Sequence, residues 1–181
     1  MKMQTSRVPP LTDGEMSPEA AAVVSPYRRP DGRLYNIHAA LARHPVAMGP
    51  FMTWARYLSR GSSLTPRERE LLILRVLWTG AVSYEWPLHV RAARAAGLND
   101  EEIEAVKAGP GSQHLTSGDA LLIAAADELM TSDSLTDPTW DALTRCYDAP
   151  GRMDVIFTVA HYVAITVIHR AFRLPLEGIS G

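Results

Sequence analysis

The amino-acid sequence predicts an all-α fold. Helix-start signals recur along the chain, such as the capping-box pattern from Thr65 to Glu68 and a second one from Asn99 to Glu102. Apolar residues follow these signals at helical spacing. No segment shows sustained alternation of apolar and polar residues with a β-branched bias, and no Asn-Gly hairpin turn is present.

The expected helices follow one another from about residue 36 onward. Thr65-Pro66 opens a helix whose run from Glu70 to Trp78 is apolar almost all round, so this helix should be buried. The uncharged run from Val155 to His169 predicts a second buried helix. About seven or eight helices are expected in all, over residues 36–43, 46–59, 65–78, 84–96, 100–107, 117–130, from 137 onward and from 153 to about 172.

A chain of 181 residues predicts one domain, at most with an added arm. Prolines and the Asp31-Gly32 turn interrupt residues 1–35, and a short helix is expected to start at Ser17-Pro18. We interpret residues 1–35 as an N-terminal arm that covers part of the body or a neighbouring subunit. Residues 36–181 are interpreted as the helical domain.

Charge and cysteine content exclude several classes of function. The formal net charge of −2 gives no electrostatic reason to expect nucleic acid or an anionic membrane as a partner. The single cysteine, Cys146, excludes an intrachain disulfide and a Cys-x-x-Cys redox or zinc site. The uncharged run 155–169 is shorter than the ~20 residues that a membrane helix needs, and no apolar targeting segment is visible. A cytoplasmic protein is therefore expected.

The residues from Glu70 to His89 are the most informative for chemistry. Glu70 lies in an apolar run, and a buried carboxylate needs charged or hydrogen-bonding partners. Glu85 and His89 are spaced i, i+4 and share one helix face. They could form an acid–base pair, an ordinary surface pair, or part of a metal site, for which two ligands are a weak signal. Pro87 belongs in a first helical turn, which places Ser83 near the N-cap and favours an ionised Glu85.

These residues resemble a known family. Glu70, the segment Tyr84-Glu85-Trp86 with His89-Val90-Arg91, and the run 95–103 are similar to the carboxymuconolactone decarboxylase family of the alkylhydroperoxidase D-like superfamily. The resemblance covers roughly residues 36–177 and includes the closing segment 172–177. It implies an all-α fold that assembles as trimers or hexamers, with sites near subunit contacts.

The resemblance also separates two branches of chemistry. The two cysteines of the redox branch fall on Val82 and Glu85, so a thiol peroxidase is disfavoured because the thiolate is the nucleophile. The decarboxylase branch keeps Glu and His at the positions of Glu85 and His89, and this chain agrees there. Trp86-Pro87 departs from that branch, which leaves the substrate open.

We therefore expect a cofactor-free acid–base enzyme, a decarboxylase acting on a small carboxylated lactone or related carbonyl acid. His89 is expected to donate the proton, because histidine titrates near neutral pH. Glu70 would orient it or relay the proton, and Glu85 would tune it or contact the substrate. An isomerase or hydrolase on the same scaffold, or a non-catalytic oligomeric protein, remains an alternative.

Three further residues are candidates for substrate binding. Tyr84 and Trp86 are expected to line the pocket. His161 lies in the long apolar helix, where a lone histidine is more often a core residue, but it could reach the same pocket. A metal-dependent variant would use Glu85, His89 and His161, although neither a metal nor a cofactor is expected. Arg75, Arg91 and Arg152 are all conceivable carboxylate binders.

Overall fold

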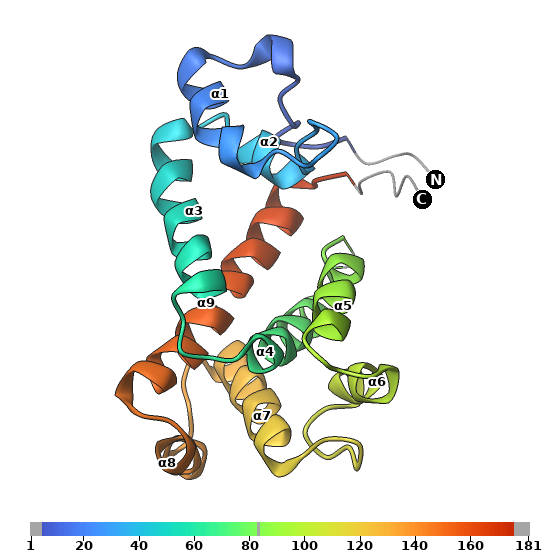
Figure 1. Ribbon diagram of the computed structural model, residues 1–181, viewed down its shortest axis with the longest axis vertical. Coiled ribbons are helices and arrows are strands. Elements are labelled where there is room, and N and C mark those ends of the chain that lie inside the picture. Colours follow the sequence, from blue (N-terminus) through green and yellow to red (C-terminus); the bar gives the residue numbers. More distant parts are fainter. Residues whose placement is uncertain (1–4, 83, 176–181) are drawn as a thin grey trace. The chain divides into compact units, whose positions relative to one another are not determined.

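The computed structural model describes residues 5–82 and 84–175, and over these ranges the chain is all-helical with no strand (Figure 1). This confirms the predicted fold class. The described helices are two 3-10 turns, η1 (Asp13–Glu15) and η2 (Ser25–Tyr27), and nine α-helices: α1 (Pro18–Val24), α2 (Asn36–Leu41), α3 (Pro45–Arg60), α4 (Pro66–Thr79), α5 (Trp86–Ala95), α6 (Asp100–Ala108), α7 (Ser117–Ser132), α8 (Asp137–Cys146) and α9 (Ala149–Phe172).

The capping boxes form as the sequence predicts. At the start of α4, the Glu68 amide donates to Thr65 Oγ1 at 3.2 Å, while the Thr65 amide donates to Glu68 Oε2 at 2.8 Å. At the start of α6, Asn99 and Glu102 exchange the same two bonds at 2.9 and 2.8 Å. Ser17 caps α1 by accepting from the Ala20 amide at 3.2 Å. Each of these side chains satisfies an amide that the helix itself leaves without a partner.

Two helix starts differ from those predicted. Helix α9 begins at Ala149, four residues before Met153, because Asp148 Oδ1 accepts from the Gly151 amide at 2.9 Å and lets the glycine enter the first turn. Helix α5 begins at Trp86 with Glu85 as its N-cap, which puts Pro87 in the first turn. The expected N-cap region at Ser83 lies outside the described residues.

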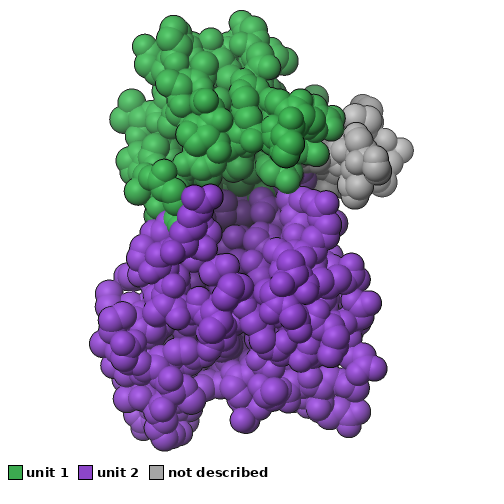
Figure 2. Space-filling view, in the orientation of Figure 1, with its two compact units in different colours: residues 1–56, 167–181 green, residues 57–166 purple. Residues whose placement is uncertain are grey.

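The chain divides into two compact units, residues 1–56 with 167–181 and residues 57–166, which Figure 2 shows in different colours. In the first unit, Ala20 and Val24 of α1 pack with Met48 and Met52 of α3. The division of the chain into an arm over residues 1–35 and a domain over 36–181 stays a prediction.

Helix α4 is the core of the unit 57–166. Helices α5, α6 and α7 all pack against it. Its apolar side chains from Leu71 to Leu74 are almost completely buried, as the all-round apolar pattern predicts. This packing fixes α4 against α5, the two helices that carry the predicted catalytic residues.

Helix α9 is long and apolar enough to cross a membrane by length and composition alone. Val155 and Val159 on this helix are buried in the core of the unit 57–166. The same length and composition occur in the core helices of soluble proteins. Only 39% of the apolar window of α9 is buried in this structure, so the predicted burial holds for the part that packs in this core.

A buried carboxylate on α9 anchors the start of the second unit. Asp154, 1% exposed, accepts from Tyr57 Oη at 2.7 Å and from the Ser63 amide and hydroxyl at 2.7 and 2.8 Å. Burial disfavours the ionised form, but these donors outweigh it and hold the pKa of Asp154 below its ordinary value.

Asp154→Ala is expected to lower the free energy of unfolding by about 2–4 kcal/mol, because it removes the buried, charged acceptor of three hydrogen bonds. Urea unfolding followed by circular dichroism measures this loss. Asp141→Ala on the exposed surface of α8 is the matched control and should change stability by no more than about 0.5 kcal/mol. Equal stability of the two variants would show that the Asp154 network does not stabilise the unit.

Candidate active site

Helices α4 and α5 bring two of the predicted residues into direct contact. Glu70 lies on the buried face of α4 and His89 lies on α5, and Glu70 Oε2 is 2.8 Å from His89 Nδ1. The side chains are 8% and 15% exposed, respectively. The carboxylate in the apolar run of α4 therefore has a specific partner, which is the histidine.

The third predicted residue faces the other nitrogen of the same ring. Glu85, the N-cap of α5, lies one turn before His89, and its Oε2 is 3.6 Å from His89 Nε2. This contact is longer than the one to Glu70, so it is an ion-pair distance rather than a short hydrogen bond. Glu70, Glu85 and His89, called the acid–base trio below, thus converge at one place.

The two carboxylates determine the charge of His89. Burial opposes the charged imidazolium, but the hydrogen bonds and negative charges of Glu70 and Glu85 outweigh it and raise the pKa of His89 to about 9. His89 is therefore protonated at neutral pH, with an N–H directed at each carboxylate. Nδ1 has the shorter contact, to Glu70, and the Nε2 proton has the longer contact, to Glu85.

Tyr162 on α9 is a site residue that sequence reasoning missed. Its ring meets the His89 ring edge-to-face, with centroids 5.1 Å apart and an interplanar angle of 88°. Burial, together with the charges of Glu85 and Glu70, raises the pKa of the Tyr162 phenol, so the hydroxyl stays protonated. The only sequence signal was a tyrosine next to His161 in an otherwise apolar helix.

His161 is buried on α9, with 3% of its surface exposed. Its ring centroid is 5.5 Å from that of Tyr162. Burial outweighs the charge of Glu85 and lowers the pKa of His161 to about 4, so its imidazole is neutral at physiological pH. Its predicted role in substrate binding stays a prediction.

Tyr84 and Trp86 lie against a small apolar cluster of Ile73, Leu77 and Val82, and Tyr162 packs on the same cluster. This places both predicted pocket residues on the apolar surface that also carries the tyrosine beside His89. Their contact with a substrate stays a prediction.

Two of the three candidate arginines have structural partners. Arg75 donates to both oxygens of Asp127 at 2.6 and 2.8 Å and to the Val106 carbonyl at 2.8 Å. Arg152 donates to the Tyr147 carbonyl at 2.9 Å and lies over the Trp140 ring. These contacts favour a structural role for both, which leaves Arg91 as the candidate carboxylate binder among the three.

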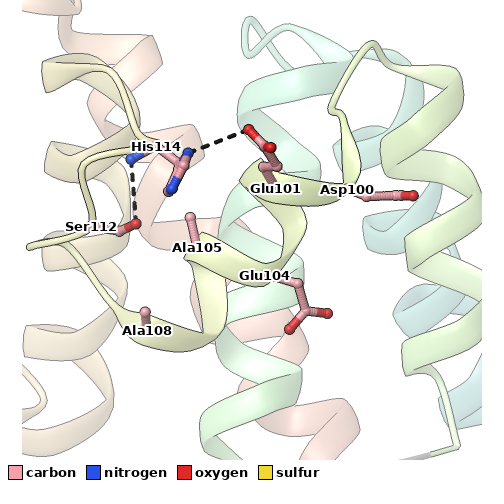
Figure 3. Close-up of a pocket in the computed structure, with 7 residues that line it drawn as sticks. All are labelled: Asp100, Glu101, Glu104, Ala105, Ala108, Ser112 and His114. Atoms are coloured by element: carbon pink, nitrogen blue, oxygen red, sulfur yellow. Dashed lines mark hydrogen bonds and ion pairs between the residues drawn. The ribbon is translucent and has the colours of Figure 1, made fainter.

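A surface pocket of about 460 Å³ lies on α6 and the loop after it (Figure 3). Its lining includes Asp100, Glu101, Glu104 and His114, and His114 Nδ1 is 3.4 Å from Glu101 Oε2. The pocket contains none of the residues of the acid–base trio. Over residues 5–82 and 84–175, the structure shows no group of three or more His, Cys, Asp or Glu residues that could hold a metal ion.

The helices of the described residues form an alkylhydroperoxidase D-like fold, as the comparisons with solved structures below show. Residues 45–127 match the model of the Carboxymuconolactone decarboxylase family. This match over part of the chain confirms the resemblance predicted from the sequence. A comparison with curated proteins finds no match.

Solved structures with a similar fold cover nearly the whole chain. An uncharacterized peroxidase-related protein from Ralstonia eutropha JMP134, described as an alkylhydroperoxidase AhpD core, aligns with a TM-score of 0.80 and 13% identity over 97% of this chain and 94% of its own. A peroxidase-related protein from Silicibacter sp. TM1040 aligns with a TM-score of 0.76 and 17% identity, over 96% and 94%. The debrominase Bmp8 aligns with a TM-score of 0.73 and 16% identity, over 97% and 94%. At these identities the likeness establishes the fold.

Proposed function

We propose that this protein is a cofactor-free acid–base enzyme, a decarboxylase acting on a small carboxylated lactone or related carbonyl acid. The observation that carries the proposal is the position of His89, held between Glu70 at 2.8 Å and Glu85 at 3.6 Å with its pKa raised to about 9. A buried imidazolium at neutral pH is a proton donor that is ready before the substrate arrives. The match of residues 45–127 to the model of the Carboxymuconolactone decarboxylase family supports the same class of reaction.

The reaction would proceed through an enolate. Cleavage of the carbon–carboxylate bond releases carbon dioxide, and the electron pair passes into the conjugated carbonyl of the substrate. His89 then transfers its Nε2 proton to the carbanionic carbon, while the contact between Nδ1 and Glu70 holds the ring in place. Water returns the proton to His89 and closes the cycle. Glu85 keeps the imidazole charged between turnovers, because its negative charge favours the protonated ring.

Two further polar residues, Tyr162 and Arg69, are close enough to the trio to act on its electrostatics. The Tyr162 hydroxyl stays protonated and is a candidate donor to the enolate oxygen. Arg69, next to Glu70 on α4, is close enough for its charge to lower the pKa of Tyr162, in opposition to the two carboxylates. Arg69 and Arg91 are therefore the cations that we propose to test for binding of the substrate carboxylate.

The fold similarity to a debrominase and to peroxidase-related proteins makes thiol chemistry the obvious competitor. The family positions of the two thiols carry Val82 and Glu85, and the sole cysteine, Cys146, is exposed at the end of α8. A thiolate nucleophile is therefore missing from the trio, and the acid–base reading is favoured.

Release of carbon dioxide from a panel of β-keto acids and carboxylated unsaturated lactones tests the proposal. We expect at least one member to lose carbon dioxide at a rate that is unchanged by prior treatment with a chelator. A substrate that is converted without release of carbon dioxide would replace the decarboxylase by an isomerase or hydrolase on the same trio. A panel that is not turned over at all would count against this substrate class.

We also propose that the chain acts as a trimer or hexamer in the cytoplasm, without a nucleic-acid or membrane partner. Two large apolar side chains in the unit 57–166 support assembly, because Trp140 on α8 and Met153 on α9 are 42% and 51% exposed. Light scattering coupled to size-exclusion chromatography gives the mass of the assembly. A monomer at all concentrations would contradict this part of the proposal.

A further inference from the structure

The C-terminal end of α9 holds a second cavity, in the unit formed by residues 1–56 and 167–181. The cavity has a volume of about 380 Å³ and is lined by His169, Arg170, Arg173, Leu174 and Pro175. Among the described residues, its lining combines two guanidinium groups and an imidazole with an apolar wall and includes no carboxylate. This volume lies within the range of about 300–1,000 Å³ for small-molecule sites.

The backbone at this cavity is unusual for the residue that it carries. Helix α9 ends in a Schellman motif, in which the Leu174 amide donates to the His169 carbonyl at 3.2 Å. Arg173 occupies the left-handed position of this motif with a φ of 54°. Glycine is the usual residue there, because a Cβ atom makes the left-handed conformation unfavourable. The arginine therefore stays at a position where glycine would be more stable, which points to a use for its side chain.

Other donors already satisfy the end of the helix. The Phe172 carbonyl accepts from the Arg7 amide at 2.8 Å and from Ser6 Oγ at 3.1 Å. The Ala171 carbonyl accepts from Arg7 Nη1 at 3.5 Å. The N-terminal segment thus provides the donors that a helix C-terminus needs.

The two guanidinium groups in the lining have no carboxylate partner among the described residues. Among residues 5–82 and 84–175, neither Arg170 nor Arg173 forms an ion pair with a carboxylate. Pro175, another lining residue, is held by a hydrogen bond from Asn36 Nδ2 to its carbonyl at 3.1 Å. The cavity therefore has a fixed apolar residue and, within the described residues, two cations that no carboxylate neutralises.

We infer that this cavity binds a small organic anion through the guanidinium groups of Arg170 and Arg173, with Leu174 and Pro175 against the carbon skeleton of the ligand. The ligand class is a small carboxylate or phosphate compound, since arginine binds both groups with paired hydrogen bonds. The acid–base trio belongs to the other unit, so this inference does not depend on the proposed enzymatic reaction.

Thermal unfolding of the full-length protein tests the site with two probes, sodium phosphate and sodium succinate, each compared with sodium chloride at the same ionic strength. A ligand that binds the folded state raises the Tm in a saturable manner. We expect such a rise with at least one probe. A response to phosphate alone would assign a phosphate compound, and a response to succinate alone would assign a carboxylate compound.

Arg173→Gly separates binding from helix stability, because its two effects have opposite signs. In sodium chloride its Tm should be higher than that of the unchanged protein, since glycine tolerates the left-handed φ. Its affinity for the probe should fall by about tenfold or more, as for loss of a charged hydrogen bond. Arg170→Ala should weaken binding similarly, whereas Arg145→Ala, which removes an exposed arginine from the last turn of α8, should bind the probe normally.

Two results would overturn the inference. One is a Tm rise that sodium chloride reproduces at equal ionic strength, which would mean general screening. The other is unchanged probe affinity in both Arg170→Ala and Arg173→Gly, which would mean that these side chains serve the helix end alone.

Discussion

His89→Gln is expected to lower kcat by about 10²–10⁴-fold, the usual contribution of a positioned general acid. Glutamine keeps a polar side chain of similar length, which can still donate to Glu70, but it has no proton to transfer at neutral pH. The substrate should still bind, so KM should change far less than kcat. Steady-state release of carbon dioxide from the substrate found in the panel measures both parameters.

The matched control for this variant is His114→Gln. His114 is about half exposed, pairs with Glu101 at 3.4 Å and lies outside the acid–base trio, so its loss should leave turnover unchanged. Circular dichroism and light scattering on both variants show whether fold and assembly are preserved. Turnover by His89→Gln within threefold of the unchanged enzyme would remove His89 from the role of proton donor.

Much of the fold could be predicted because its signals are local. The Thr65–Glu68 and Asn99–Glu102 capping boxes start α4 and α6 at the expected residues, since the side chain that caps the helix is three residues from the amide that it satisfies. The start of α9 was wrong by four residues. Gly151 is a helix breaker by propensity, and a single side chain, Asp148, reverses that preference.

In the candidate site, too, the contacts set by local spacing could be predicted, whereas those set by tertiary packing could not. The i, i+4 spacing of Glu85 and His89 predicts that they face one another, and the ion pair at 3.6 Å agrees. The partnership of Glu70 with His89 depends on how α4 packs against α5, which the sequence indicates only through the burial of Glu70 and the family resemblance. Tyr162 was missed because α9 reaches His89 through tertiary packing, and residue spacing carries no information about that contact.

The stability of the protein is expected to decrease as the pH rises from 6.5 to 9, by about 3 kcal/mol from His89 alone. The pKa of His89 is about 9 in the folded chain and 6.5 in the reference state, so the folded state binds the proton more tightly. The stabilisation is fully present below pH 6.5, where both states are protonated, and is lost as the pH approaches 9. The two pKa values differ by about 2.5, and each pKa unit corresponds to about 1.4 kcal/mol; a small part of this stabilisation remains at pH 9, where half of the folded chains still hold the proton.

His161 changes the pH dependence of stability in the opposite direction, but it does so below pH 6.5. Its pKa is lowered to about 4, so its contribution to stability is present above pH 6.5 and is lost as the pH falls toward 4. Urea unfolding at half-unit steps from pH 6.5 to 9 therefore reports His89 with little interference from the second buried histidine.

Glu70→Gln identifies the carboxylate as the cause of this pH dependence. The amide can still accept or donate at 2.8 Å from Nδ1, but it removes the negative charge that favours the imidazolium. The pKa of His89, followed by the chemical shifts of its ring in NMR, should fall toward 6.5, and the slope of stability between pH 6.5 and 9 should flatten with it. A slope that persists while the pKa falls would mean that another group carries the pH dependence. If the pKa stays near 9 instead, Glu85 is the dominant partner, and the longer 3.6 Å contact matters more than the shorter one.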